Sequence, residues 1–243
     1  MILALAALIA LSPKPAELEK QCKAGKGAAC HELGTIYMYG RNVERDDKKG
    51  AGLYRTACKL GDKDGCADEA FSLVLGNGQY ADPVPGLERL ESLCKAGRQL
   101  ACANLGALFL QGFGKKEGAE RGPALLQTAC DKGIASACRT LASTLAQKQD
   151  FDGASKLADR ACQAGDPEGC AVLGKMFEIS SDVLRAGVSY AKACEMGSSV
   201  GCYEQGMLLI RSGTDRDKGL KLLKKACFEG NQGACAAAHD PFL

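Results

Sequence analysis

Cysteines recur along this chain in pairs, and both the pairs and the intervals between them are regular. Seven residues separate the two members of every pair, and successive pairs begin 36, 36, 36, 32, 32 and 33 residues apart. A glycine stands three residues after each first cysteine, and Ala or Gly precedes each second cysteine. The pairs are Cys22 and Cys30, Cys58 and Cys66, Cys94 and Cys102, Cys130 and Cys138, Cys162 and Cys170, Cys194 and Cys202, and Cys227 and Cys235. One unit of 32 to 36 residues is therefore repeated, which limits the chain to repeat architectures.

Each unit has the pattern of two helices. The first, which we name helix A, begins near the second cysteine and carries apolar residues three and seven positions later, such as Leu105 and Phe109, with a small residue at position four, such as Gly106. The second, helix B, ends near the next first cysteine, with a larger residue four positions before it and a small one eight positions before it, such as Leu126 and Gly122. These spacings place the side chains on one face of a helix.

A helix pair of this length cannot bury its own apolar face, so consecutive pairs must stack. The sequence therefore predicts an all-α fold, an α-solenoid of stacked antiparallel helix pairs. We expect a single domain over residues 14–238, with about six repeats and an N-terminal half-repeat, followed by a tail at 239–243. Residues 1–13 resemble the apolar core of a secretory signal without its basic start, so this segment is truncated, uncleaved or simply a hydrophobic helix end.

The balance of positive and negative residues limits the classes of partner that we expect. The chain has 31 Lys and Arg against 29 Asp and Glu, which argues against nucleic acid as the main partner. No apolar run reaches the roughly 18 residues of a spanning helix, so no stable membrane span is expected. The remaining expectation is a monomer that binds a protein or peptide of unknown identity.

The pattern A-C-x-x-G-x(4)-C-x-x-L-G-x-x-[YF]-x-x-G resembles the Sel1-like repeat, a relative of the tetratricopeptide repeat. Residues 29–40 and 101–112 match its helix A closely, and the paired cysteines resemble the cysteine-rich branch typified by the Helicobacter cysteine-rich proteins. The resemblance covers residues 14–238 and implies a solenoid that serves as a secreted or periplasmic scaffold. Some members of this family are labelled penicillin-binding proteins or weak β-lactamases, which supplies an alternative function by analogy alone.

Within each repeat, the two cysteines would face each other across the short turn from helix B to helix A, a placement compatible with a disulfide. Disulfides in every repeat would require an oxidising, extracytoplasmic compartment. Reduced structural thiols and a zinc site are the alternatives. Zinc sites use C-x(2–4)-C spacing, however, and the chain offers just two histidines, His31 and His239. We expect no metal and no cofactor.

The chain contains only parts of two known catalytic motifs. Two S-x-x-K matches, Ser92–Lys95 and Ser189–Lys192, lack the S-D-N and K-T-G elements of β-lactamases and are interpreted as helix-surface residues. His31 and Glu32 begin like H-E-x-x-H without its second histidine, so His31 is interpreted as a surface residue. We predict no catalytic residue.

The candidate binding surface is the outward-pointing face of helix A, at positions two, five and nine after the second cysteine. In related solenoids helix A lines the concave face. The candidate residues are Glu32, Thr35, Tyr39, Asp68, Phe71, Leu75, Asn104, Gln111, Thr140, Ser143, Lys175, Ile179, Met207 and Arg211.

Four of these residues, Phe71, Leu75, Ile179 and Met207, are apolar where exposure is expected, which suggests binding. We expect an extended peptide with Phe71 and Leu75 as apolar anchors and Asn104 and Gln111 as hydrogen-bonding groups. Longer A–B loops near residues 40–47, 76–84 and 112–121 would form one lip of the groove. The alternative is an unconstrained face exposed to solvent.

Overall fold

The computed structural model describes residues 14–114 and 116–240, and these ranges form fourteen α-helices without a strand. The odd-numbered helices, each corresponding to helix B, are α1 Pro15–Lys23, α3 Asp47–Lys59, α5 Pro83–Lys95, α7 Lys116–Asp131, α9 Phe151–Gln163, α11 Val183–Glu195 and α13 Arg216–Phe228. The even-numbered helices, each corresponding to helix A, are α2 Gly27–Tyr39, α4 Lys63–Leu75, α6 Gln99–Leu110, α8 Ala135–Gln147, α10 Pro167–Ile179, α12 Ser199–Arg211 and α14 Gln232–Ala238. The predicted signal-like segment, residues 1–13, lies outside the described residues.

A disulfide joins every turn from helix B to helix A, and the predicted pairing is confirmed at all seven turns. The joined residues are Cys22 with Cys30, Cys58 with Cys66, Cys94 with Cys102, Cys130 with Cys138, Cys162 with Cys170, Cys194 with Cys202, and Cys227 with Cys235. Among the described residues no cysteine is left free, so the alternatives of reduced thiols and of a zinc site built from these sulfurs do not describe this structure. Each disulfide closes a turn whose ends lie 8 positions apart.

The turn between the two cysteines has a constant geometry. Its glycine ends helix B in the left-handed conformation, as at Gly61 with φ 88°, where a Cβ would be strained. In four of the seven turns a side chain then caps the next helix, as where Asp62 Oδ1 accepts the backbone N–H of Gly65 at 2.6 Å. Asp166 caps α10 in the same way, whereas Asp131 is the last residue of α7.

The small residues of both helices allow close packing within a pair. A Cβ added at Gly34 in α2 would lie 2.7 Å from the ring of Tyr54 in α3, and one added at Gly50 would lie 3.1 Å from the carbonyl oxygen of Gly34. The same relationship recurs between α6 and α7, where a Cβ added at Gly122 would lie 3.1 Å from the carbonyl oxygen of Gly106. Any larger side chain at these positions would force the two helices apart.

The core is a continuous series of small clusters between consecutive helices. Leu90 packs with Val74 of α4 and Leu105 of α6, so one cluster spans three helices and ties neighbouring repeats together. The residues four positions before each first cysteine from the second pair onward are all buried, and they are Tyr54, Leu90, Leu126, Ala158, Tyr190 and Leu223. This confirms the α-solenoid that the sequence pattern predicts.

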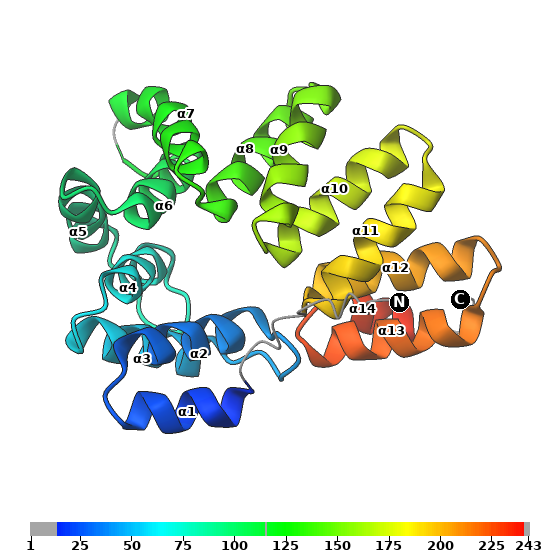
Figure 1. The fold of residues 1–243 in the computed structure, drawn as a ribbon, viewed down its shortest axis with the longest axis horizontal. Coiled ribbons are helices and arrows are strands. Elements are labelled where there is room, and N and C mark those ends of the chain that lie inside the picture. Colours follow the sequence, from blue (N-terminus) through cyan, green and yellow to red (C-terminus); the bar gives the residue numbers. More distant parts are fainter. Residues whose placement is uncertain (1–13, 115, 241–243) are drawn as a thin grey trace, which may run out of the picture.

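The solenoid curls into an almost closed ring, so that its first repeat meets its last ones (Figure 1). Arg41, in the connection from α2 to α3, places Nη2 3.6 Å from Oε2 of Glu168 at the start of α10. A Cβ added at Gly40 would overlap the carbonyl oxygen of Glu229, in the turn after α13. Glu229 itself is only 1% exposed. The two ends of the repeat series therefore lie in direct contact.

The connections from helix A to helix B differ from expectation at one place. The connection from α2 to α3 covers residues 40–46 and that from α4 to α5 covers residues 76–82, much as predicted. The connection from α6 to α7 ends earlier than predicted because α7 already begins at Lys116. Residues 116–121, which the sequence assigns to a loop, include Ala, Glu, Lys and Arg, and these residues favour helix. The predicted loop at 112–121 is therefore partly wrong.

Candidate functional site

A pocket of about 650 Å³ lies at the inner side of the ring. Its walls come from four successive A helices, α2, α4, α6 and α8, and from the turn that begins α10. Arg41 and Arg45 of the α2–α3 connection close one side. The curl of the solenoid therefore turns a row of helix faces into a concave site.

Eight of the fourteen predicted binding residues line this pocket. They are Thr35, Tyr39, Asp68, Phe71, Asn104, Gln111, Thr140 and Ser143. The other six, Glu32, Leu75, Lys175, Ile179, Met207 and Arg211, do not line it. The structure therefore brings together most of the candidates of α2 to α8 and leaves apart those of α10 and α12.

Three of the four candidate residues of α10 and α12, Lys175, Met207 and Arg211, contact other side chains outside the pocket. Glu178 binds Lys175 at 2.9 Å and Arg211 at 2.8 Å, which ties these side chains to each other. Met207 is half-buried against the core cluster around Leu223. This explains why the predicted groove does not extend along every A helix.

The expectation that the apolar candidates stand exposed is largely wrong. Phe71 and Leu75 are half-buried and pack against the cluster around Leu90, while Ile179 alone is exposed, at 44%. The reason is that the side chains of Phe71 and Leu75 also reach the cluster that Leu90 forms with Leu105 of the following A helix. Phe71 also lines the pocket, whereas Leu75 only packs against this cluster.

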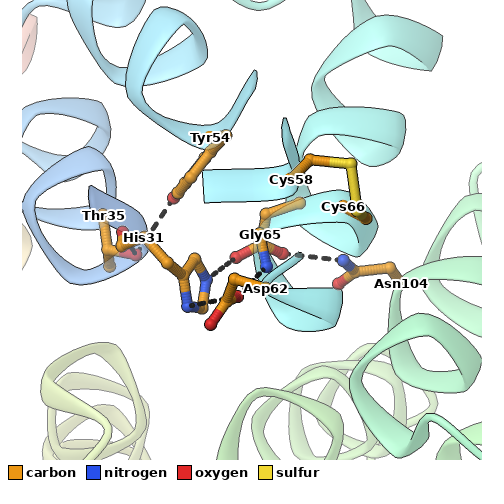
Figure 2. Close-up of polar contacts among 9 residues, drawn as sticks. His31, Thr35, Tyr54, Cys58, Asp62, Gly65, Cys66 and Asn104 are labelled. Carbon is orange, nitrogen blue, oxygen red and sulfur yellow. Dashed lines mark hydrogen bonds and ion pairs between the residues drawn. A yellow bond between two sulfur atoms is a disulfide. The ribbon is translucent and has the colours of Figure 1, made fainter. Parts of the chain in front are cut away.

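Hydrogen bonds between side chains that line the pocket join three adjacent A helices. Asp68 of α4 accepts Nδ2–H of Asn104 at Oδ1, 2.8 Å away, and its Oδ2 lies 2.8 Å from Nε2 of His31. Figure 2 shows His31 and Asn104 approaching α4 from its two sides. Asn104 is only 9% exposed, so its amide holds the carboxylate of Asp68 in place.

His31 was missed as a site residue, and its interpretation as a surface residue is wrong. Its side chain is 21% exposed, its Nδ1 lies 4.0 Å from Asp62 Oδ1, and its ring stands 5.6 Å from that of Tyr54. Burial alone would lower the pKa of His31, but the hydrogen bond to Asp68 and the charges of Asp68, Asp62 and Asp64 raise it above the ordinary value. The imidazole therefore keeps its second proton to a higher pH than an exposed histidine does.

Hydroxyl groups complete this part of the wall. Tyr54 donates to Thr35 Oγ1 at 3.1 Å, and Thr35 donates to the carbonyl oxygen of His31 at 3.2 Å. Burial raises the pKa of Tyr54 well above its ordinary value, so the phenol keeps its proton. These contacts hold the side chains of α2 and α3 in one arrangement.

Two arginines, Arg41 and Arg139, also line the pocket. Nε of Arg139 in α8 donates to Oδ2 of Asp166, 2.9 Å away, and Arg41 faces Glu168 at 3.6 Å. Tyr39 lies among these charges, because Asp68, Arg139, Glu168 and Arg41 all act on its hydroxyl. Burial is the largest influence, and it raises the pKa of Tyr39 above its ordinary value.

His31, Arg139 and Arg41 line the pocket but were not predicted as site residues. His31 and Arg139 both directly follow a second cysteine, a helix A position that also faces the pocket. That periodic signal was present in the sequence. Arg41 meets Glu168 only because the ring closes, and no local pattern indicates this. Asp166 occupies the same position in its turn as Asp62, so its approach to Arg139 follows from the repeat.

The S-x-x-K serines lie away from the pocket. Ser92 is exposed on α5, and Ser189 is 7% exposed within α11, so the interpretation as a surface residue holds for Ser92 and is wrong for Ser189. Among residues 14–114 and 116–240, no group of three or more His, Cys, Asp or Glu side chains is arranged to hold a metal ion. No helix of the same ranges combines the length and apolarity that crossing a bilayer requires.

Comparisons with known proteins agree with this architecture. The sequence profile of the Sel1 repeat matches residues 27–62, 99–134 and 193–231, each of which includes the turn that joins a helix B to the next helix A. The crystal structure of a Sel1 repeat protein from Oxalobacter formigenes has a TM-score of 0.59 at 18% sequence identity, over 87% of this chain and 94% of that one. That similarity bears on the fold alone.

Two further structures show weaker similarity. Yeast Tom70 has a TM-score of 0.49 at 13% identity, over 92% of this chain and 57% of that one. The protective antigen c5321 of uropathogenic Escherichia coli, which displays an SLR fold, has a TM-score of 0.42 at 16% identity, over 93% and 59% of the two chains. A search of curated proteins found no match.

Proposed function

We propose that this chain, in which three segments match the Sel1 repeat, is a non-catalytic scaffold that binds a protein or peptide partner in the inner pocket of its ring. Repeat solenoids present extended concave surfaces of this kind to other proteins. The seven disulfides indicate an oxidising compartment, so we place the protein outside the cytoplasm, in the periplasm or secreted.

The observation that carries this proposal is the continuity of the pocket across repeats. Thr35, Asp68, Asn104 and Thr140 line it from α2, α4, α6 and α8, so one ligand can contact four consecutive A helices. A small-molecule active site rarely needs such a row of equivalent positions. A polypeptide does, because its own groups repeat along its length.

The lining chemistry suits a peptide backbone. Gln111 offers an amide, Thr140 and Ser143 offer hydroxyls, and Phe71 offers an apolar surface. Each of these can pair with a backbone carbonyl, a backbone N–H or a small apolar side chain. The disulfide at each turn fixes the relative position of helices, which lowers the ordering cost of binding.

The experiment compares the same change, serine to arginine, at one position inside the pocket and one position outside it. Ser143→Arg places a long charged side chain inside the pocket, and Ser92→Arg places the same side chain on the exposed surface of α5. We expect a partner captured from an extracytoplasmic extract to bind wild type and Ser92→Arg alike and to lose affinity for Ser143→Arg. Equal binding by all three oxidised, folded proteins would place the partner elsewhere.

A further inference from the structure

The ring closes through a seam, our name for the contact between residues 40–45 of the α2–α3 connection and the turns of the last repeats. This seam buries Glu229, which is 1% exposed and whose two carboxylate oxygens have no hydrogen-bond partner among the described residues. Lys225 Nζ stands 3.6 Å from Oε1, longer than a hydrogen bond, and donates to the carbonyl oxygen of Cys194 at 3.2 Å. A carboxylate buried in this way costs free energy when it is ionised.

The position that Glu229 occupies is exposed in most other turns. It stands two residues after the first cysteine of its pair, where the other turns have Ala24, Leu60, Ala96, Lys132, Ala164 and Met196. Five of these six residues are exposed, and Met196 is half-buried. Glu229 is buried because the α2–α3 connection covers its turn, so an open ring would return its carboxylate to water.

The seam is polar and is formed largely by backbone. A Cβ added at Gly197 would lie 3.0 Å from Nδ2 of Asn42, and one added at Gly230 would lie 3.0 Å from Cβ of Arg45. No hydrophobic cluster of the described residues includes side chains from both sides of the seam. Closure therefore adds little hydrophobic stabilisation, and the seam can separate without exposing the core.

Few groups near Glu229 offset the cost of its charge. Lys225 approaches from α13, and the backbone N–H of Asn42 approaches from the α2–α3 connection. Arg45 of the same connection donates to both carboxylate oxygens of Asp47, at 2.6 and 2.9 Å. Burial is the largest influence on the pKa of Glu229 and raises it above the ordinary value, although Lys225 and Asn42 act to lower it.

The pair of Arg41 and Glu168 responds to pH in the opposite direction. Burial also raises the pKa of Glu168, and its ionised carboxylate attracts Arg41 across the seam. The side chains of Arg41 and Glu168 are 28% and 20% exposed, and their closest atoms are 3.6 Å apart. Water screens such a pair, so it contributes little, and the fully buried Glu229 determines how the seam responds to pH.

We propose that Glu229 is a pH-dependent switch of ring closure: the protonated side chain permits the closed ring, and the ionised one opens the seam. The closed ring is favoured fully below the ordinary pKa of the carboxyl group and progressively less as pH rises through the raised value. Opening separates Arg41 from Glu168 and removes one wall of the inner pocket. Its effect on a partner rests on the proposed function, whereas the opening itself does not.

Small-angle X-ray scattering of the oxidised full chain between about pH 4 and about pH 8 tests the switch. We expect the radius of gyration of wild type to rise with pH toward that of Gly40→Ala, in which an added Cβ prevents closure. Glu229→Gln should keep the acidic wild-type value throughout. So should Glu229→Ala, since Ala occupies the equivalent position in three other turns.

Glu88→Gln, which removes an exposed carboxylate of α5, is the matched control and should follow wild type. A wild-type radius of gyration that is independent of pH would overturn the proposal. An increase in either Glu229 variant equal to that of wild type would also overturn it, as would an increase accompanied by loss of helix in circular dichroism. No partner is present in this measurement, so its outcome and that of the Ser143→Arg comparison are independent.

Discussion

Arg41 in the α2–α3 connection and Glu168 at the start of α10 meet with Nη2 3.6 Å from Oε2, although most of the repeat series lies between them. This contact and the close approach of Gly40 to Glu229 close the solenoid on itself. A pocket that would be a shallow groove in an open solenoid thereby gains a wall on its far side.

Ring closure predicts a specific effect at Gly40. This residue has φ 66°, and an added Cβ would overlap the carbonyl oxygen of Glu229, so Gly40→Ala must displace the α2–α3 connection from the turn after α13. We expect a larger radius of gyration in small-angle X-ray scattering. The left-handed backbone adds a local cost of about 1 kcal/mol.

Gly213 provides the matched control for that change. It has φ 67° with nothing within 4 Å of an added Cβ, so Gly213→Ala bears a similar backbone cost without a clash. Its radius of gyration should equal that of wild type. If Gly40→Ala also keeps the wild-type value, the two ends of the solenoid are not held together in solution.

The disulfide pattern predicts the mass of the oxidised protein and the loss of stability when one disulfide is removed. Oxidised protein should weigh about 14 Da less than reduced protein, one hydrogen for each of 14 cysteines, and peptide mapping should join only the two members of each pair. Replacing Cys130 and Cys138 by Ala should lower the free energy of unfolding by about 2.6 kcal/mol, the chain-entropy value for a loop whose ends are 8 positions apart. Free thiols in most pairs would refute this pattern, as would bound metal in elemental analysis.

The His31–Asp68 pair predicts a pH-dependent stability. The folded protein raises the pKa of His31 above that of the unfolded chain, so the pair stabilises most fully below the unfolded value. That stabilisation is lost as pH rises through the raised folded pKa. Relative to wild type, His31→Gln should therefore be most destabilised in mildly acidic buffer and least above neutral pH, as followed by thermal unfolding.

His239 is the other histidine of the chain, and it is exposed at the end of α14. His239→Gln should reproduce the wild-type pH profile. A constant difference between His31→Gln and wild type across the whole pH range would mean that the ion pair with Asp68 contributes nothing that titrates.

The catalytic alternative predicts turnover of nitrocefin that depends on an S-x-x-K serine. Ser92 on α5 and Ser189 within α11 both lie outside the pocket, and Ser189 is 7% exposed. We expect no turnover above the uncatalysed background. Substantial turnover that disappears in Ser92→Ala or Ser189→Ala would instead assign the protein a β-lactamase activity.

The repeat pattern predicted the fold because it is local. The interval between Cys94 and Cys102, the left-handed glycine at the turn and the notch at Gly106 each act within one or two helices. Stacking then follows, since no pair can bury its face alone. The disulfide partners followed from the same short distances.

The candidate site was only partly predictable, because its shape depends on the sum of small rotations between repeats. Sequence periodicity identified residues such as Thr35, Asp68 and Thr140 on one face. It gave no means of knowing that Arg41 would come to face Glu168, or that the pocket would end before α12. Closure of a ring is a property of the whole series and not of any single repeat.

The most direct test of the account is hydroxyl-radical footprinting of the protein with and without its captured partner. We predict that Tyr39 and Phe71, which line the pocket, lose reactivity on binding. Leu184 and Val188 of α11, which are 86% and 70% exposed and lie outside the pocket, should keep theirs. Protection of Leu184 and Val188 with unchanged oxidation of Tyr39 and Phe71 would contradict binding through the inner face.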